Sequence, residues 1–355
     1  MKAGEQEAGR SGCGSRAAGG SAATGRRAAA LGVLAWALVW GQIPRIGVID
    51  FYGLRRLSAE RVRKLLGVSE GDPLPASKAA VEEKLEALPE VVRARLEAVC
   101  CVEDRAILYV GIEEKGAPHF EFRYPPRENV SLPAEIVESY REFLRALEAA
   151  ARRGEAGEDL SRGYALAADP ATRAYQERFR QFAESDLKTL RQVLRRSMHE
   201  EQRAIAAYVI GYAPRARGVV EDLQYAMQDA DQGVRANAMR ALAAVAVLAR
   251  RDPELGLRVE PTWFVEMLNS IVWSDRYRAA AALVNLTEDR PAGVLAHLRE
   301  RALPSLVEMA RWKTLGHALP AFLLVGRIAG LGEAEIYRAW ERGERERVIA
   351  RALGR

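Results

Sequence analysis

The strongest constraint on the fold is a motif that recurs three times in the second half of the chain. An arginine is followed three residues later by alanine, and three residues after that by a small or branched apolar residue. The copies are Arg203–Ala206–Val209, Arg235–Ala238–Ala241 and Arg278–Ala281–Val284. Repeats of roughly 30–45 residues are typical of stacked helix pairs, because one pair alone cannot bury its apolar stripe. We therefore predict a helical stack over residues 133–355.

Each copy of the motif follows a polar turn that is suited to begin a helix. The turns are His199-Glu200-Glu201, Asp229-Ala230-Asp231 and Ser274-Asp275. Carboxylates at these positions can cap free N–H groups and interact favourably with the positive end of the helix dipole. We predict structural roles in the stack for the three motif arginines and for two of the turn aspartates. We expect each arginine to bridge to an acidic group of the adjoining repeat. The five are Arg203, Arg235, Arg278, Asp231 and Asp275.

The segment from Asp231 to Leu242, DQGVRANAMRAL, resembles a HEAT repeat. The resemblance is clear over about residues 190–290, and a fainter helical pattern continues to about residue 354. It implies an α-solenoid that binds partners through a curved surface and seldom catalyses a reaction.

A different pattern occupies residues 44–115, where the local signals give the order strand, helix, helix, strand, strand. A β-type run begins at Ile46, and Ser58 offers a side-chain oxygen at a helix start. A second helical pattern ends at Pro89, and strand-like runs follow at Val92–Val99 and Ala106–Ile112. Together with the helical stack, this order predicts an α+β fold.

These residues resemble a POTRA domain. The matching pieces are Gly53, Ser58-Ala59-Glu60, Gly71-Asp72-Pro73, the segment LEALPEVVRA at residues 85–94, and Val110-Gly111-Ile112-Glu113. The resemblance implies an exported module that captures an extended segment at a sheet edge, with the unpaired N–H and C=O groups of an edge strand as the physical basis. No alternating barrel strands follow in the sequence, so barrel assembly is not implied.

Residues 1–41 resemble an export signal or a short membrane anchor. A weakly basic stretch ends in Arg26-Arg27, and an apolar run from Ala28 to Trp40 follows. As a helix, that run rises only about 20 Å, which is less than a bilayer core of ~30 Å. Cleavage would give a periplasmic or secreted protein, and retention would give an inner-membrane anchored one. Either way, we expect membrane contact only through this segment.

Three cysteines occur, Cys13 in the signal-like segment and the neighbours Cys100 and Cys101. The neighbours are consistent with two ordinary thiols on opposite strand faces, with a strained disulfide between them, or with intermolecular pairing. A disulfide there would be a candidate for redox regulation. A metal site is not expected, because no second Cys or His pair lies at ligand spacing.

The sequence contains no motif that assigns a catalytic site. Neither a phosphate-binding loop nor a nucleophile elbow is present, and the four histidines form no metal-binding pair. A Pro-rich connector occupies residues 116–132, before the first predicted stack helix. Glu158-Asp159 is a pair of carboxylates in the loop after that helix, and we expect it to be solvated or to cap a turn rather than to act in catalysis. The formal charge of +5 is spread among offsetting glutamates, which argues against nucleic acid as a partner.

The leading hypothesis is therefore an exported, non-catalytic protein-interaction scaffold without cofactors. Its ligand would be an extended segment at the sheet edge of residues 44–115 or a partner on the concave helical surface. Two alternatives stay open at this point. One is a helical-repeat enzyme of lyase-like or glycosylase-like type, and the other is a division-type inner-membrane anchored protein.

Overall fold

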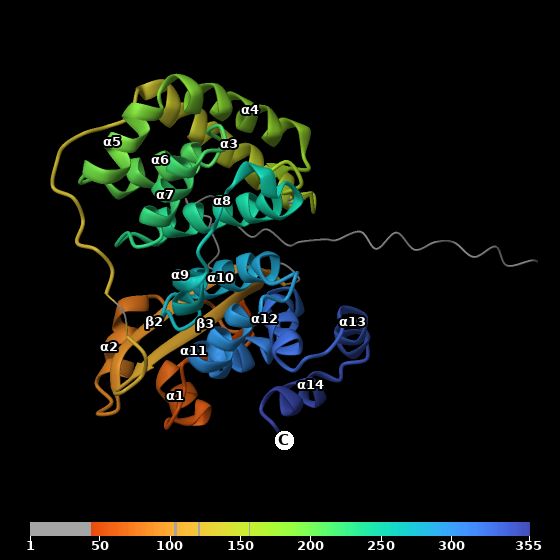
Figure 1. The fold of residues 1–355 in the computed structure, drawn as a ribbon. Coiled ribbons are helices and arrows are strands. Elements are labelled where there is room, and N and C mark those ends of the chain that lie inside the picture. The colour runs from red at the N-terminus through yellow and green to blue at the C-terminus, as the bar shows by residue number, and fades with distance from the viewer. Residues whose placement is uncertain (1–43, 103–104, 120, 156) are drawn as a thin grey trace, which may run out of the picture.

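The computed structural model describes residues 44–102, 105–119, 121–155 and 157–355. The signal-like segment 1–41 lies outside these residues. The protein has an α+β fold, as the sequence predicts. Figure 1 shows two lobes: one contains the N-terminal sheet together with the C-terminal helices, and the other contains the helices between them.

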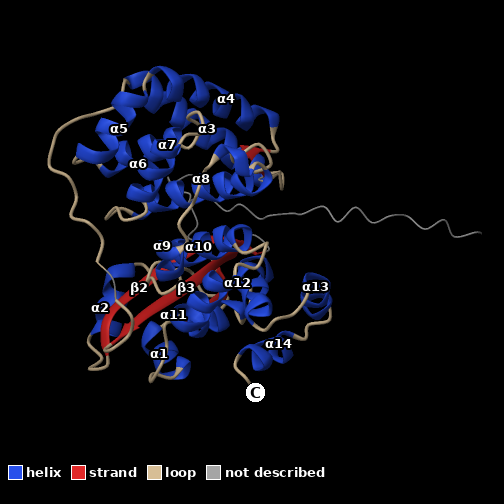
Figure 2. Ribbon diagram, in the orientation of Figure 1, coloured by secondary structure: helices blue, strands red, loops and turns tan. Residues whose placement is uncertain are grey.

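The N-terminal part has the expected order of strand, helix, helix, strand, strand. Its elements are β1 (Ile46–Tyr52), α1 (Ala59–Leu66), α2 (Lys78–Glu86), β2 (Val91–Val102) and β3 (Arg105–Glu114). The strand order is β1-β3-β2, with β1 parallel and β2 antiparallel to β3. Figure 2 shows β2 and β3 side by side. Ser58 caps α1 by accepting the N–H of Arg61, and Gly67 ends it with a φ of 70°, a conformation that glycine adopts without strain.

The second lobe follows the connector. Its elements are α3 (Ala134–Arg152), β4 (Glu158–Asp159), β5 (Leu166–Ala167), α4 (Pro170–Ser185), α5 (Leu187–Arg196), α6 (Glu200–Ile210), α7 (Arg217–Ala226) and α8 (Gln232–Arg251). The chain then returns to the sheet. The remaining elements are a short 3₁₀ helix (Pro253–Leu255), α9 (Thr262–Met267), α10 (Trp273–Leu286), α11 (Ala292–Ala310), α12 (Leu315–Ile328), α13 (Glu333–Glu341) and α14 (Arg345–Ala352).

From α5 onward the helices pack as successive pairs. Each odd-numbered helix lies against the next even-numbered one, as in α5 with α6 and α7 with α8. The even-numbered helices also pack on one another in sequence order, from α6 to α14. Alanine is frequent on these helices: α8 alone buries Ala236, Ala238, Ala241, Ala243, Ala244 and Ala246. Small side chains let the neighbouring helix axes approach, which increases the dispersion contacts between the backbones.

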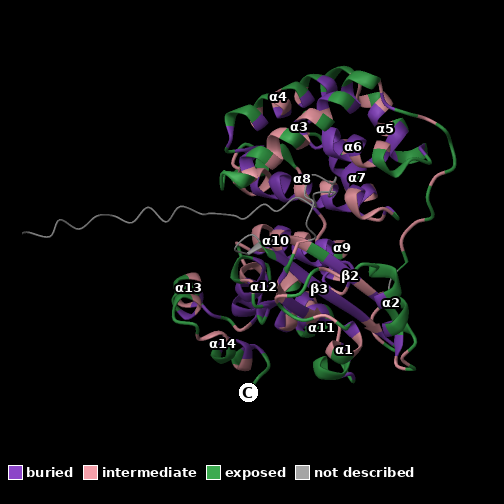
Figure 3. Cartoon of the chain, turned by 180° about the vertical axis from the view of Figure 1, so that it is seen from behind, coloured by how far each residue is buried: buried purple, intermediate pink, exposed green. Residues whose placement is uncertain are grey.

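The sheet is covered on both faces. One face packs on α1 and α2 around Val62, Leu85 and Val110. The other face contributes Tyr52 and Tyr109 to the same apolar core as the C-terminal helices. Figure 3 shows the buried strands between these layers. Residues 44–115 and 133–355 therefore share one core, although they are separate in the sequence.

Among the described residues, no helix is both long enough and apolar enough to cross a bilayer.

Candidate functional site

The repeated arginines form a ladder of buried ion pairs between helix pairs. Arg203 of α6 donates two hydrogen bonds of 2.9 Å to Asp229, and a third to the carbonyl of Ser197. Arg235 of α8 likewise donates two hydrogen bonds, of 3.0 and 2.8 Å, to Asp275 in the following helix pair. Both arginines are 1% exposed. Each joins its own helix to the following pair, as expected from the motif.

The third rung is Arg276, and the assignment of Arg278 to this position is wrong. Arg276 Nε donates to the carbonyl of Ser270, six residues back, which is the spacing that separates Arg203 from Ser197. Its Nη1 lies 3.4 Å from Glu308 in the next pair. The run Ala279–Ala282 lets the motif fit either arginine, and the position of the preceding turn selects Arg276. Arg278 is half-buried, and burial lowers its pKa.

The two predicted aspartates have different roles. Asp231 caps α8 by accepting the N–H of Val234 at 3.0 Å, as the acidic turn predicts. Asp275 is not a cap. It lies inside the first turn of α10 and is completely buried, where Ser270 Oγ and Arg235 donate to it. This carboxylate is therefore part of the ladder, and α10 needs another group at its N-terminus.

The sheet supplies that group. Glu97 of β2 accepts the backbone N–H of Trp273, the first residue of α10, at 2.8 Å. Asp50 of β1 accepts the N–H of Lys313, just before α12, at 2.9 Å. In the opposite direction, Glu308 of α11 accepts the N–H of Gly53 at 3.0 Å. Neither α10 nor α12 has a side-chain cap from its own N-cap residue. Glu97 therefore caps α10 from the sheet, and Asp50 holds the turn that leads into α12.

Burial raises the pKa of the Asp50, Glu97 and Glu308 carboxyl groups, and the backbone N–H groups that each one accepts act in the opposite direction. These bonds cross the interface between the sheet and the helical stack. A carboxylate that is buried and capped in this way fixes the register of the two surfaces, because a shift would leave it without partners.

An aromatic cluster fills the centre of the same interface. Tyr109 of β3 stacks on Trp273 and packs against Trp312, each at a ring-centroid distance of 5.0 Å. The Tyr109 hydroxyl forms a 2.7 Å hydrogen bond with Nδ1 of His317 on α12. Burial lowers the pKa of His317 to about 4, so the imidazole is neutral at pH 7. Tyr52 donates to the carbonyl of Ile271 at 2.6 Å, which completes the contact of the sheet with the turn before α10.

The connector contacts the turns that precede α6 and α8. Residues 121–132 run along the outside of the molecule between the lobes (Figure 1). Arg123 N–H donates to the carbonyl of Gln228 at 2.9 Å, before α8. Glu128 pairs through both backbone groups with the turn before α6: its N–H donates to Arg196 at 3.0 Å, and its carbonyl accepts from Met198 at 2.7 Å. The acceptors Arg196 and Gln228 each lie seven residues before a ladder arginine.

Side chains of the connector contact the same turns. Phe122 lies 3.7 Å from the Arg235 guanidinium, ring centroid to Cζ. Arg123 lies 3.3 Å from the centre of the Tyr225 ring. Glu128 accepts from Arg196 Nε at 2.7 Å. We name the surface formed by residues 195–199 and 225–231 together with Arg235 the connector seat. Sequence reasoning placed an extended link at 116–132 but gave no signal for this seat.

Both edges of the sheet are partly capped by glutamate side chains. On β2, Glu86 accepts the outward N–H of Ala94 at 2.9 Å, and Glu82 accepts that of Leu96 at 2.7 Å. On β1, Glu70 accepts the N–H of Ile49 at 3.1 Å. Carboxylates at these positions compete with a guest strand for the same backbone donors. The first half of β2 is therefore less suited to capture a peptide than the POTRA resemblance implies.

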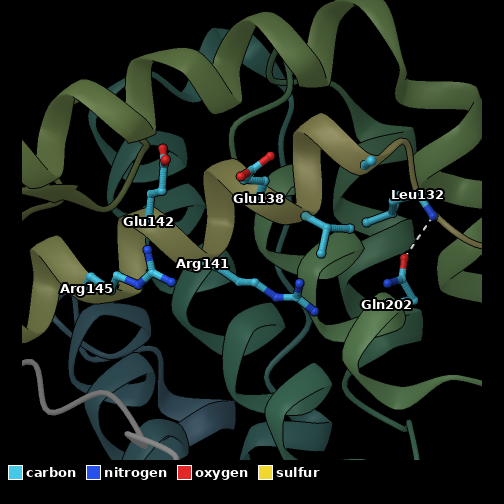
Figure 4. A pocket seen from close by; sticks show the side chains of 8 residues that line it. Leu132, Glu138, Arg141, Glu142, Arg145 and Gln202 are labelled. Atoms are coloured by element: carbon cyan, nitrogen blue, oxygen red, sulfur yellow. Dashed lines mark hydrogen bonds between the residues drawn. The ribbon is translucent and has the colours of Figure 1, made fainter.

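A shallow hollow of about 480 Å³ lies on the exposed face of α3. Its lining consists of Leu132, Ala134, Val137, Glu138, Arg141, Glu142, Arg145 and Gln202. Figure 4 shows the carboxylates of Glu138 and Glu142 on one side of the helix and the two arginines on the other. Charged and polar side chains therefore predominate in this hollow, beside three apolar ones.

The Glu158-Asp159 pair is divided between two roles. Asp159 accepts the N–H of Ser161 at 2.8 Å and caps the turn, as expected. The Glu158 side chain is only 15% exposed and forms an ion pair with Arg240 of α8, so its expected solvation is wrong. Arg240 also donates to the carbonyl of Ala165 at 2.7 Å, and these contacts hold the β4–β5 segment on the stack.

Cys100, at the end of β2, takes part in a disulfide bond. Its partner lies outside the side chains that the structure describes, so a bond between Cys100 and Cys101 stays a prediction. Within the described ranges, no cluster of three or more His, Cys, Asp or Glu side chains could hold a metal ion.

The chain matches no known family model, no curated protein and no solved structure. Its function must therefore be inferred from its own residues and their geometry.

Proposed function

We propose that the protein is an exported, non-catalytic interaction scaffold that binds extended polypeptide along the turns of its helical stack. The observation that carries this proposal is the connector seat. There, a segment without regular secondary structure is held by backbone bonds at two successive turns, with Glu128 paired in both directions. The chain thus supplies an example in cis of the ligand class that we infer.

The proposed architecture is a POTRA-like domain docked on a HEAT-like α-solenoid. Support comes from the strand and helix order of residues 44–115 and from the sequential packing of the even-numbered helices. The arginine ladder adds support, because its rungs recur at one position of successive pairs. In such a stack, each turn presents the same backbone groups at regular intervals.

The turns between successive helices offer hydrogen-bonding groups that an extended chain can use. The last carbonyl groups of a helix have no partner within the helix, so Arg196, at the end of α5, can accept from a bound segment. Guanidinium groups beside the turns add cation–π contacts to aromatic side chains, each worth about 0.5–2 kcal/mol. Capping of the β2 edge by Glu82 and Glu86 favours these turns over the sheet edge.

The test is binding of the connector peptide in trans. A fluorescent peptide with the sequence of residues 118–133 is titrated into the protein carrying Phe122→Ala and Arg123→Ala, and fluorescence polarisation is recorded. We expect saturable binding to this variant. Binding to the unmodified chain should be at least about tenfold weaker, because a tethered segment competes at an effective concentration in the millimolar range.

A peptide with the same two alanine substitutions is the matched control, and it should bind at least about tenfold more weakly than the native peptide. Equal binding of the two peptides, or no binding of the native peptide by the folded variant, would contradict the proposal. Export is tested separately by fractionating cells that carry a tagged chain and by measuring the N-terminal mass. An intact N-terminus in the cytosolic fraction would contradict the export proposal.

A further inference from the structure

The exposed face of α3 carries two charged side chains that have no partner among the residues that the structure describes. Glu138 and Arg145 lie two turns apart on one stripe of the helix, and both are exposed. Within the described residues, neither side chain takes part in a hydrogen bond or an ion pair. They flank the hollow on this helix, as Figure 4 shows. Arg141 and Glu142 lie between them and also line the hollow. Arg141 pairs with Glu201 at 3.1 Å.

The stripe is self-complementary when the helix is reversed. A twofold axis between residues 141 and 142 places Glu138 of one helix opposite Arg145 of an antiparallel copy, and the same pair forms again on the other side of the axis. Ala134 and Ala149 then lie opposite each other at the two ends. Both are exposed, and their small side chains let two helices approach closely.

We propose that α3 is a self-association surface, on which two copies of this chain pair antiparallel through reciprocal Glu138–Arg145 contacts. The occupant of the hollow is thus the α3 helix of a second copy. The charge pattern favours this occupant, because the reversed copy places Arg145 opposite Glu138 and Glu138 opposite Arg145. This surface is separate from the connector seat, so the inference goes beyond the proposed function.

The expected association is weak. One helix face of about four turns buries less than the roughly 800 Å² per partner of a standard interface. Exposed ion pairs add about 0.2–1 kcal/mol each and are screened by salt. A dimer with a dissociation constant on the order of 10–100 µM at low salt is consistent with these magnitudes.

The experiment is sedimentation velocity on the full chain and on charge-reversed variants, over concentrations that bracket the expected constant. Glu138→Arg places arginine opposite arginine, and Arg145→Glu places glutamate opposite glutamate. Each single variant should be at least about tenfold weaker in self-association than the native chain. The double variant Glu138→Arg/Arg145→Glu should recover dimerisation, because its pairs are again of opposite sign.

An equimolar mixture of the two single variants gives the sharpest readout. Only the mixed dimer has two attractive pairs, so the mixture should dimerise where neither variant alone does. Both positions are exposed, and unchanged circular dichroism would verify that the variants fold. A native chain that stays monomeric throughout the concentration range would overturn the proposal. Single variants that dimerise like the native chain, or a mixture that stays monomeric, would do the same.

Discussion

Replacing Arg235 by methionine should destabilise the protein by about 3–5 kcal/mol, which is the usual cost of removing one partner of a buried ion pair. Arg235 supplies two bonds to Asp275 and two to the carbonyls of Asp229 and Ala230. After the substitution, the hydroxyl of Ser270 is the one donor to the fully buried Asp275 that remains among the described residues. The cost is therefore mainly that of an uncompensated buried charge, since methionine fills most of the same volume.

The assay is urea unfolding followed by far-UV circular dichroism, with a second substitution that isolates the cause. Asp275→Leu in the Arg235→Met background should recover at least half of the lost stability, because it removes the stranded charge. Arg217→Met is the matched surface control. Its side chain is 89% exposed and pairs with Glu221, so we expect a change within about 0.5 kcal/mol.

A loss for Arg235→Met no larger than that of the surface control would refute the structural role of the ladder. Strict additivity of the Arg235→Met and Asp275→Leu losses would also refute the argument, since it would show that the two side chains do not interact across the helix pairs.

Three further outcomes are expected at the interface between the sheet and the stack. Glu97→Ala should lower the free energy of unfolding by about 1–2 kcal/mol, because the Trp273 N–H loses its acceptor. Hydrogen exchange at the start of α10 should become faster, and unchanged exchange there would contradict this. Gly111→Ala should destabilise the protein, because the added Cβ would lie 2.7 Å from the carbonyl oxygen of Ile271. In the control Gly293→Ala, the added Cβ meets no atom within 4 Å, so this variant should be neutral or more stable. Equal melting temperatures of the two variants would count against the packing of β3 on the turn before α10. With a pKa lowered to about 4, His317 stays neutral in the folded state while the unfolded chain takes up a proton below pH 6.5, so stability should fall by roughly 3 kcal/mol from pH 6.5 to 4. His317→Phe should remove that component of the pH dependence of urea unfolding, and an unaltered profile would contradict the assignment.

Local signals were sufficient to predict the order of elements along residues 44–115, because short apolar runs alternate there with turn residues. Ser58 and Asp231 cap the helices that they were expected to begin. The sheet order β1-β3-β2 was not predicted. The ladder was predicted as a motif, but its third position was not. The sequence of α10 offers two arginines and four consecutive alanines, and only the tertiary position of the turn distinguishes Arg276 from Arg278.

The contact between the sheet and the stack could have been inferred from β3. Residues 106–111 of this strand are buried without alternation, and a continuous apolar run is typical of a strand that is covered on both faces. The capping of α10 by Glu97 and the contact of Asp50 with the turn before α12 could not have been inferred, because each carboxylate lies more than a hundred residues from its partner in the sequence. The connector seat has no periodic signal for the same reason: its contacts exist only after the pairs have stacked.

The most direct test of the central claim, that the sheet packs on the helical stack, is hydroxyl-radical footprinting of the intact chain. Tyr52 and Tyr109 are at most 1% exposed at this interface, whereas Tyr124 of the connector is 93% exposed and serves as an internal reference. We expect Tyr124 to be oxidised rapidly and Tyr52 and Tyr109 to be protected. Oxidation of Tyr52 and Tyr109 at rates like that of Tyr124, in a chain whose circular dichroism is still helical, would show that this face of the sheet is open and would contradict the claim.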